Sequence, residues 1–106
     1  PAADIHETES HYHIFIDLAG IDPSSVELVI EGRVLHLTGE RCRPRVEDCN
    51  RIHQLEIDFG PFRRVFQFPM DLNSDGAESL YRQGFLEVIL PKLPESQCVR
   101  VPLHHE

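Results

Sequence analysis

Short segments in which apolar and polar residues alternate recur along the chain, separated by turn residues. In the clearest segment, Tyr12, Ile14, Ile16 and Leu18 alternate with polar neighbours such as His13. Residues two apart in a strand lie on the same face, so this pattern predicts a strand with one buried face. No stretch of the chain shows a sustained helical period, and we therefore predict a nearly all-β protein.

The same alternation predicts further strands downstream. They cover residues 4–8, 26–30, 34–38, 55–59 and 62–68, followed by a hairpin over 79–91 that turns at Gln83 and Gly84 and is stopped by Pro91. Turn-forming residues at 22–25, 31–33 and 71–76 separate these strands. Regularly spaced short strands favour an antiparallel, immunoglobulin-like β-sandwich, in which two sheets enclose the core.

Residues 40–51 interrupt this rhythm. They carry Arg41, Arg43 and Arg45 among other charged residues, with Val46 as an isolated apolar residue, so they cannot belong to the core. The pattern alone is compatible with a surface loop.

The order of several motifs resembles the small heat shock proteins, the Hsp20 or alpha-crystallin family, of the bacterial or archaeal type. Five motifs carry the resemblance: the opening strands at 4–8 and 12–20, a Gly-Glu-Arg turn at 39–41, the block at 59–69, the hairpin at 79–92, and a C-terminal tripeptide formed by Val99, Arg100 and Val101. The block at 59–69 places Arg64 on the family's usual arginine. In the hairpin, Ser79 and Gln83 stand where the family usually has Ala and Asn. No single motif is specific, whereas their order and spacing are.

The resemblance implies an alpha-crystallin domain over residues 1–92 and a C-terminal extension over residues 93–106. It also implies three sets of site residues. They are a groove for clients or for the C-terminal arm at Val26, Leu28, Ile30, Leu80 and Tyr81, a dimer interface at Arg41, Arg43, Arg45, Val46, Ile52 and Arg64, and an arm that links oligomers at Val99, Arg100 and Val101. In the resembled family, a loop like 41–54 supplies a strand to the partner's first strand.

The function implied is that of an ATP-independent molecular chaperone, a holdase that binds unfolding client proteins and prevents their aggregation. It would associate with itself into dimers and larger homo-oligomers, and it would be neither an enzyme nor in need of a cofactor. The alternative is a co-chaperone or scaffold module related to p23 and CS domains, which binds a folded partner. The tripeptide arm and the block at 60–69 favour the first reading.

Composition limits the remaining classes of function. The 106 residues suffice for one domain, and their net charge of −8 argues against a nucleic-acid partner. No apolar run is long enough to cross a membrane, and no secretion signal opens the chain, so we expect a soluble, cytoplasmic protein. Three cysteines without a pairing pattern fit a reducing compartment. The first residue, Pro1, suggests a domain excised from a longer protein.

Three groups of residues remain as candidates for other chemistry. His11 and His13 share a strand face and could bind a metal with His104 or His105, although solvated histidines are the default. Cys42 and Cys49 are either free thiols or a redox sensor. Arg64, among phenylalanines, is either a surface arginine on the outward face or an arginine that is ion-paired near a subunit contact.

Overall fold

The computed structural model describes residues 1–93, which form strands joined by turns and two single-turn 3₁₀ helices. The elements in chain order are β1 (Ala3–Glu7), β2 (His11–Asp17), η1 (Pro23–Ser25), β3 (Glu27–Glu31), β4 (Val34–Arg41), β5 (Gly60–Gln67), η2 (Ser74–Gly76), β6 (Glu78–Arg82) and β7 (Phe85–Pro91). The prediction of a nearly all-β chain is confirmed.

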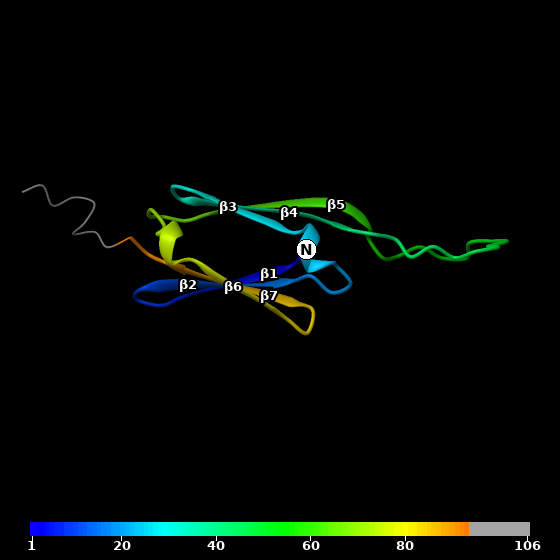
Figure 1. The fold of residues 1–106 in the computed structure, drawn as a ribbon, viewed down its shortest axis with the longest axis horizontal. Coiled ribbons are helices and arrows are strands. Elements are labelled where there is room, and N and C mark those ends of the chain that lie inside the picture. The colour runs from blue at the N-terminus through cyan, green and yellow to red at the C-terminus, as the bar shows by residue number, and fades with distance from the viewer. Residues whose placement is uncertain (94–106) are drawn as a thin grey trace, which may run out of the picture.

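The strands form two sheets that lie one over the other (Figure 1). One sheet has the order β1-β2-β7-β6 and the other the order β3-β4-β5, and all neighbouring strands are antiparallel. This is the predicted antiparallel sandwich. β1 and β6 are the edges of the first sheet, and β3 and β5 are the edges of the second.

The core lies between the sheets and is built from the inward-facing residues of each strand. In β2, Tyr12, Ile14 and Ile16 are buried, whereas His13 and Phe15 between them point outward. The other buried residues are Leu18, Ile21, Leu35, Leu37, Phe66, Phe68, Leu72, Leu86, Val88 and Leu90. Removal of this apolar surface from water is the main force that holds the two sheets together.

The hairpin between β6 and β7 forms where the sequence predicts it. Arg82 pairs with Phe85, and the two residues between them, Gln83 and Gly84, have φ angles of 54° and 84°. Two successive residues with positive φ are typical of the type I′ turn that joins twisted strands. Glycine adopts this conformation readily, but glutamine does so rarely, so Gln83 is a strained position.

Two predictions about local structure are wrong. Residues 39–41 do not turn: they continue β4 and pair with residues 60–62 of β5, where Gly39 lies against the Phe62 ring. A Cβ atom on Gly39 would lie 2.6 Å from Phe62 Cζ, so a larger residue here would have to displace the Phe62 ring. Residues 55–59 do not form a strand, because within residues 1–93 no strand edge lies alongside them to pair with.

Candidate functional site

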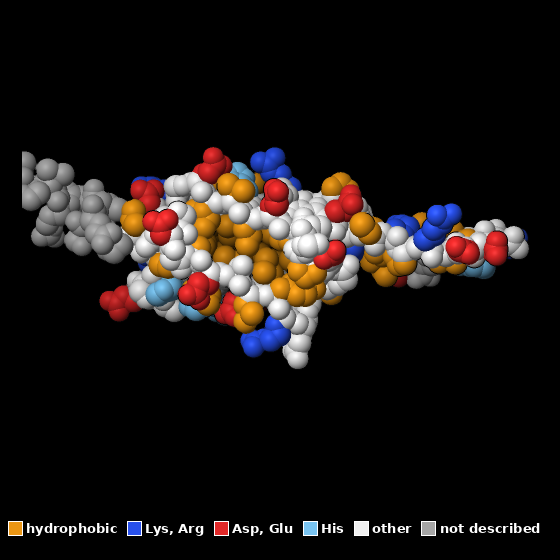
Figure 2. Space-filling view, viewed as in Figure 1, with side chains coloured by type: hydrophobic (Ala, Val, Ile, Leu, Met, Phe, Trp, Pro, Cys, Tyr) orange, Lys and Arg blue, Asp and Glu red, His pale blue; other side chains and the backbone are white. Residues whose placement is uncertain are grey.

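An apolar groove runs between the edge strands β3 and β6, where the two sheets part. The space-filling view shows this groove as an uncovered band of hydrophobic side chains across the centre of the molecule (Figure 2). It contains two adjoining hollows, of about 160 Å³ and 310 Å³. Leu28 and Ser79 line both hollows, so the hollows form one continuous site.

Four of the five residues predicted for the groove do line it. Val26 and Tyr81 lie in the smaller hollow, Ile30 lies in the larger one, and Leu28 borders both. Leu80 does not line it: its side chain is 51% exposed on the opposite, outer face of β6, beside Phe15 and Phe85. The placement of Leu80 is therefore wrong, because residues adjacent in a strand point to opposite faces.

Small residues of β6 face the groove instead of Leu80. Ser79 borders both hollows, and Ala77, directly before β6, borders the larger one. Leu35, Leu86 and Val88 of the core form the groove floor. The sequence contained the signal for Ser79 and Ala77, since they precede Tyr81 by two and four residues and must share its face.

One end of the groove is closed by polar contacts. The Tyr81 hydroxyl lies 3.3 Å from the Leu18 carbonyl and 3.4 Å from the Ile21 carbonyl and donates to them. Nearby, Asp22 caps η1 by accepting a hydrogen bond of 3.0 Å from the Ser24 backbone N–H, and this bond lowers the pKa of the Asp22 carboxyl. These contacts fix the chain that enters β3, so this end of the groove is preformed.

Both sides of the groove are free strand edges. Within residues 1–93, β3 pairs only with β4, and β6 pairs only with β7. Each edge therefore presents backbone N–H and C=O groups that have no strand beside them. An extended peptide could hydrogen-bond to such an edge and insert alternate side chains into the groove.

Residues 42–59 connect β4 to β5 and extend away from the sandwich (Figure 1). This connection, which we call the loop, holds the predicted interface residues Arg43, Arg45, Val46 and Ile52. Its apolar side chains are largely uncovered: Val46 is 70% exposed, Ile52 64%, Leu55 60% and Ile57 62%. So much exposed apolar surface on one segment is typical of a region that is buried by a partner.

Arg41 and Arg64 lie in strands rather than in the loop. Arg41 ends β4, where its Nη1 donates to the Asp58 carbonyl at 3.4 Å, and its buried Nε has no hydrogen-bond partner within residues 1–93. Arg64 is part-buried in β5, lies over the Phe66 ring and donates to the Pro1 carbonyl. The interpretation of Arg64 as an outward-facing arginine is therefore wrong. Among residues 1–93 it forms no ion pair.

Cys42 and Cys49 are exposed free thiols in the loop. The Cys42 Sγ donates to a Glu40 carboxylate oxygen at 3.5 Å. This hydrogen bond and the negative charge of Glu40 raise the pKa of the Cys42 thiol. Because the thiolate is the reactive form, Cys42 is poorly suited to a role as a fast redox sensor.

Within residues 1–93, the histidines of β2 do not form a metal site with other side chains. The rings of His11 and His13 are 6.2 Å apart, and each has another polar neighbour, Ser10 for His11 and Glu87 for His13. Within residues 1–93, no three His, Cys, Asp or Glu side chains come close enough to hold a metal ion. The other proposed ligands, His104 and His105, lie outside the described residues.

The predicted arm, Val99, Arg100 and Val101, also lies outside the described residues. Both helices formed within residues 1–93 are single 3₁₀ turns, and neither is able to span a bilayer.

Comparison with known proteins identifies relatives along nearly the whole chain. The profile of the Hsp20/alpha crystallin family matches residues 4–102. The spore protein SP21 of Stigmatella aurantiaca is 33% identical over 101 residues, which are 95% of this chain and 60% of that protein. A 17.6 kDa class I heat shock protein of Helianthus annuus is 34% identical over 95 residues, which are 89% of this chain and 62% of that protein. The chain thus spans less than two thirds of either relative.

Solved structures show the same fold. The crystal structure of hspA from Xanthomonas axonopodis is 35% identical, with a TM-score of 0.76 over 87% of this chain and 92% of that chain. A small heat-shock protein from Xylella fastidiosa, described as having a distinct high order structure, is 27% identical, with a TM-score of 0.78 over 99% of this chain and 96% of that chain.

These matches agree with the predicted family and with the predicted sandwich. The two-sheet sandwich, the profile match over residues 4–102 and the relatives above 30% identity lead to one conclusion: this chain belongs to the Hsp20/alpha crystallin family of small heat shock proteins.

Proposed function

We propose that the chain acts as an ATP-independent holdase, which binds unfolding client proteins and keeps them from aggregating. The observation that carries this proposal is the open apolar groove between two free strand edges. Unfolding proteins expose extended apolar segments, and the groove offers such a segment both an apolar floor and backbone hydrogen bonds. Family membership supports the same role.

The composition of the surface suits a holdase. A net charge of −8 keeps the molecule soluble and disperses its complexes with clients, although the groove itself is apolar. The groove is lined mainly by apolar side chains such as Val26, Leu28 and Ile30, which contribute contact surface for binding. Binding by contact alone requires no nucleotide.

Light scattering of a heat-labile client, with and without the protein, tests the proposal. We expect suppression of aggregation at near-stoichiometric amounts, and the same suppression with or without ATP. The variant Ser79→Trp should reduce suppression severalfold, because a large side chain at this exposed position would obstruct the groove where the two hollows adjoin, without removing a core residue.

Leu80→Gln provides the matched control. It removes an exposed apolar side chain from the same strand but from the face opposite the groove, so suppression should remain as in the wild type. If the full-length protein leaves aggregation unchanged, the holdase proposal is wrong, and the p23-like alternative, a module that binds folded partners, gains support. If Leu80→Gln reduces suppression as much as Ser79→Trp, the clients bind elsewhere.

We also propose that the protein associates with itself through three parts of the chain. The loop, with Arg43, Arg45, Val46 and Ile52, would pair with the free edge of a partner's β1, and Arg41 and Arg64 would border this interface. The exposed apolar residues of the loop and the unpartnered Nε of Arg41 support this arrangement. Residues 93–106 would form an extension whose Val99 and Val101 enter a neighbour's groove while Arg100 points away.

The contacts of such an extension would be weak individually and effective in number. Two buried valines contribute at most a few kcal/mol, and ordering the segment offsets part of this. Larger assemblies should therefore depend on concentration and exchange subunits readily.

The three cysteines support the cytoplasm as the proposed location.

A further inference from the structure

Lys92 is the only lysine in the chain, and it lies at the end of β7 in an unusually enclosed position. Its side chain is only 13% exposed, and its Nζ lies 2.6 Å from Oε2 of Glu7, the last residue of β1. The ammonium group also lies 5.1 Å from the centre of the Tyr12 ring. Lysines are usually solvated, so this degree of enclosure indicates a specific role for the contact.

The main chain at Lys92 joins the same region. The Lys92 N–H donates to the Ser10 carbonyl at 2.9 Å, and the Leu93 N–H donates to the Asp71 carbonyl at 3.1 Å. The end of β7 is therefore bonded both to the turn between β1 and β2 and to the segment that follows β5. This backbone frame holds the Lys92 side chain in place over β1.

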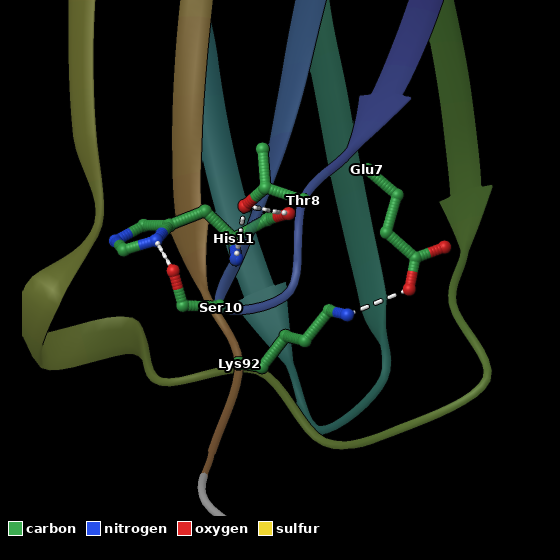
Figure 3. Close-up of polar contacts among 5 residues, drawn as sticks. All are labelled: Glu7, Thr8, Ser10, His11 and Lys92. Atoms are coloured by element: carbon green, nitrogen blue, oxygen red, sulfur yellow. Dashed lines mark hydrogen bonds and ion pairs between the residues drawn. The ribbon is translucent and has the colours of Figure 1, made fainter.

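The turn that receives Lys92 is itself rigid. Thr8 Oγ1 accepts a hydrogen bond of 2.9 Å from the His11 N–H and lies 3.2 Å from the His11 carbonyl, while Ser10 Oγ lies 2.6 Å from His11 Nδ1 (Figure 3). Glu7 directly precedes this turn. The Glu7–Lys92 ion pair therefore attaches β7 to a hairpin whose turn is hydrogen-bonded.

β1 depends on such a contact because its own packing is slight. Only Ala3 of β1 is partly buried, and β2 is the only strand that pairs with it within residues 1–93. Arg64 contacts the Pro1 carbonyl just before β1, and Lys92 contacts Glu7 at its end. Among the ion pairs of residues 1–93, Glu7–Lys92 is the only one that involves β1.

We propose that Lys92 is a positioning residue that holds the edge strand β1 in place as a preformed template for a second copy of this chain. The inference rests on the proposed pairing of β1 with a partner's loop. A strand edge that is already ordered loses less conformational entropy when another strand adds to it. Removal of the lysine should therefore loosen β1 and weaken self-association together.

Hydrogen exchange of the full protein tests this directly. In Lys92→Gln, exchange of the amides in residues 1–10 should rise roughly fivefold, the change expected for loss of one partly buried ion pair, while residues 27–41 exchange as before. Glu7→Gln should have the same effect, and the two changes together should add nothing further. The exchanged pair, Glu7→Lys with Lys92→Glu, should restore much of the protection.

Glu31→Gln is the matched control. It removes the contact between Glu31 Oε1 and His36 Nε2, which are 3.2 Å apart in the other sheet, and it should leave residues 1–10 unchanged. Unchanged exchange at residues 1–10 in Lys92→Gln, or a rise equal to that in the control, overturns the inference. Subunit exchange measured in parallel separates the role of Lys92 in ordering β1 from the proposed pairing of β1 with a partner's loop. If β1 loosens but self-association is unaffected, Lys92 orders β1, and the proposed pairing at β1 is wrong.

Discussion

The strand β4 and residues 55–59 of the loop carry the same kind of alternating apolar pattern, but only β4 is a strand. Leu35 and Leu37 of β4 are fully buried, and β4 pairs with β3 on one side and β5 on the other. Leu55 and Ile57 are exposed, and residues 55–59 have no strand beside them within residues 1–93. An alternating pattern therefore marks a segment that is able to form a strand, whereas an available edge decides whether it does.

This contrast indicates that the sandwich and the loop have different roles. The sandwich encloses its core between its own two sheets, so it can fold as a single copy. Val46, Ile52, Leu55 and Ile57 of the loop are exposed instead, and no other part of residues 1–93 covers them. The following predictions test this comparison.

The largest difference should appear between two isoleucines. Ile14 in β2 is fully buried, and Ile57 in the loop is 62% exposed. Ile14→Ala should lower the free energy of unfolding by about 3 kcal/mol, since it removes buried methyl groups and leaves a cavity. Ile57→Ala should change it by less than about 0.5 kcal/mol when the protein is dilute. Urea denaturation of both variants provides the measurement.

The concentration dependence of the Ile57→Ala result sharpens this test. A loss of stability that grows with protein concentration would place Ile57 in a subunit interface, because association stabilises the folded state by mass action. An equal loss in both variants at low concentration would contradict the view that the sandwich is complete without the loop.

Deletion of residues 43–50 should affect assembly and leave the fold intact. The removed residues lie outside the core, so the shortened chain should still unfold cooperatively, with little change in its midpoint. Sedimentation velocity should show that it is monomeric. Glu47→Gln, which preserves the length of the loop, serves as the control and should assemble as the wild type does. A deletion variant that remains dimeric would refute the exchange of loops and indicate another interface.

The smallest predicted effect concerns Cys42, where β4 passes into the loop. Its thiol pKa is raised by the hydrogen bond and the charge of Glu40, so less thiolate is present at neutral pH than for an ordinary cysteine. Glu40→Gln removes the charge and should lower this pKa, and alkylation of Cys42 near pH 7 should become severalfold faster. Cys49, which forms no bond to Glu40, should react at an unchanged rate. Peptide mass spectrometry distinguishes the two sites, and an unaltered Cys42 rate would contradict the role of Glu40.

The sequence by itself determined the sandwich, and its resemblance to the family implied much of the groove. Alternation assigns Tyr12, Ile14 and Ile16 to one face, because side chains in a strand must point to opposite sides in turn, and Gln83-Gly84 specifies the tight turn between β6 and β7. The same local rule places Leu28 and Ile30 on one face of β3, whereas the family resemblance implied that this face borders a groove. These features depend on residues that are close together in the sequence, so they can be predicted from the sequence alone.

Only the tertiary structure decided which edges lie side by side and what each edge faces. It turned Arg64 inward against Phe66 and brought Lys92 to Glu7 across 85 residues of chain. It also left residues 55–59 without a strand beside them within residues 1–93. Such outcomes depend on pairing and packing between segments that are distant in the sequence, and no local pattern encodes those distances.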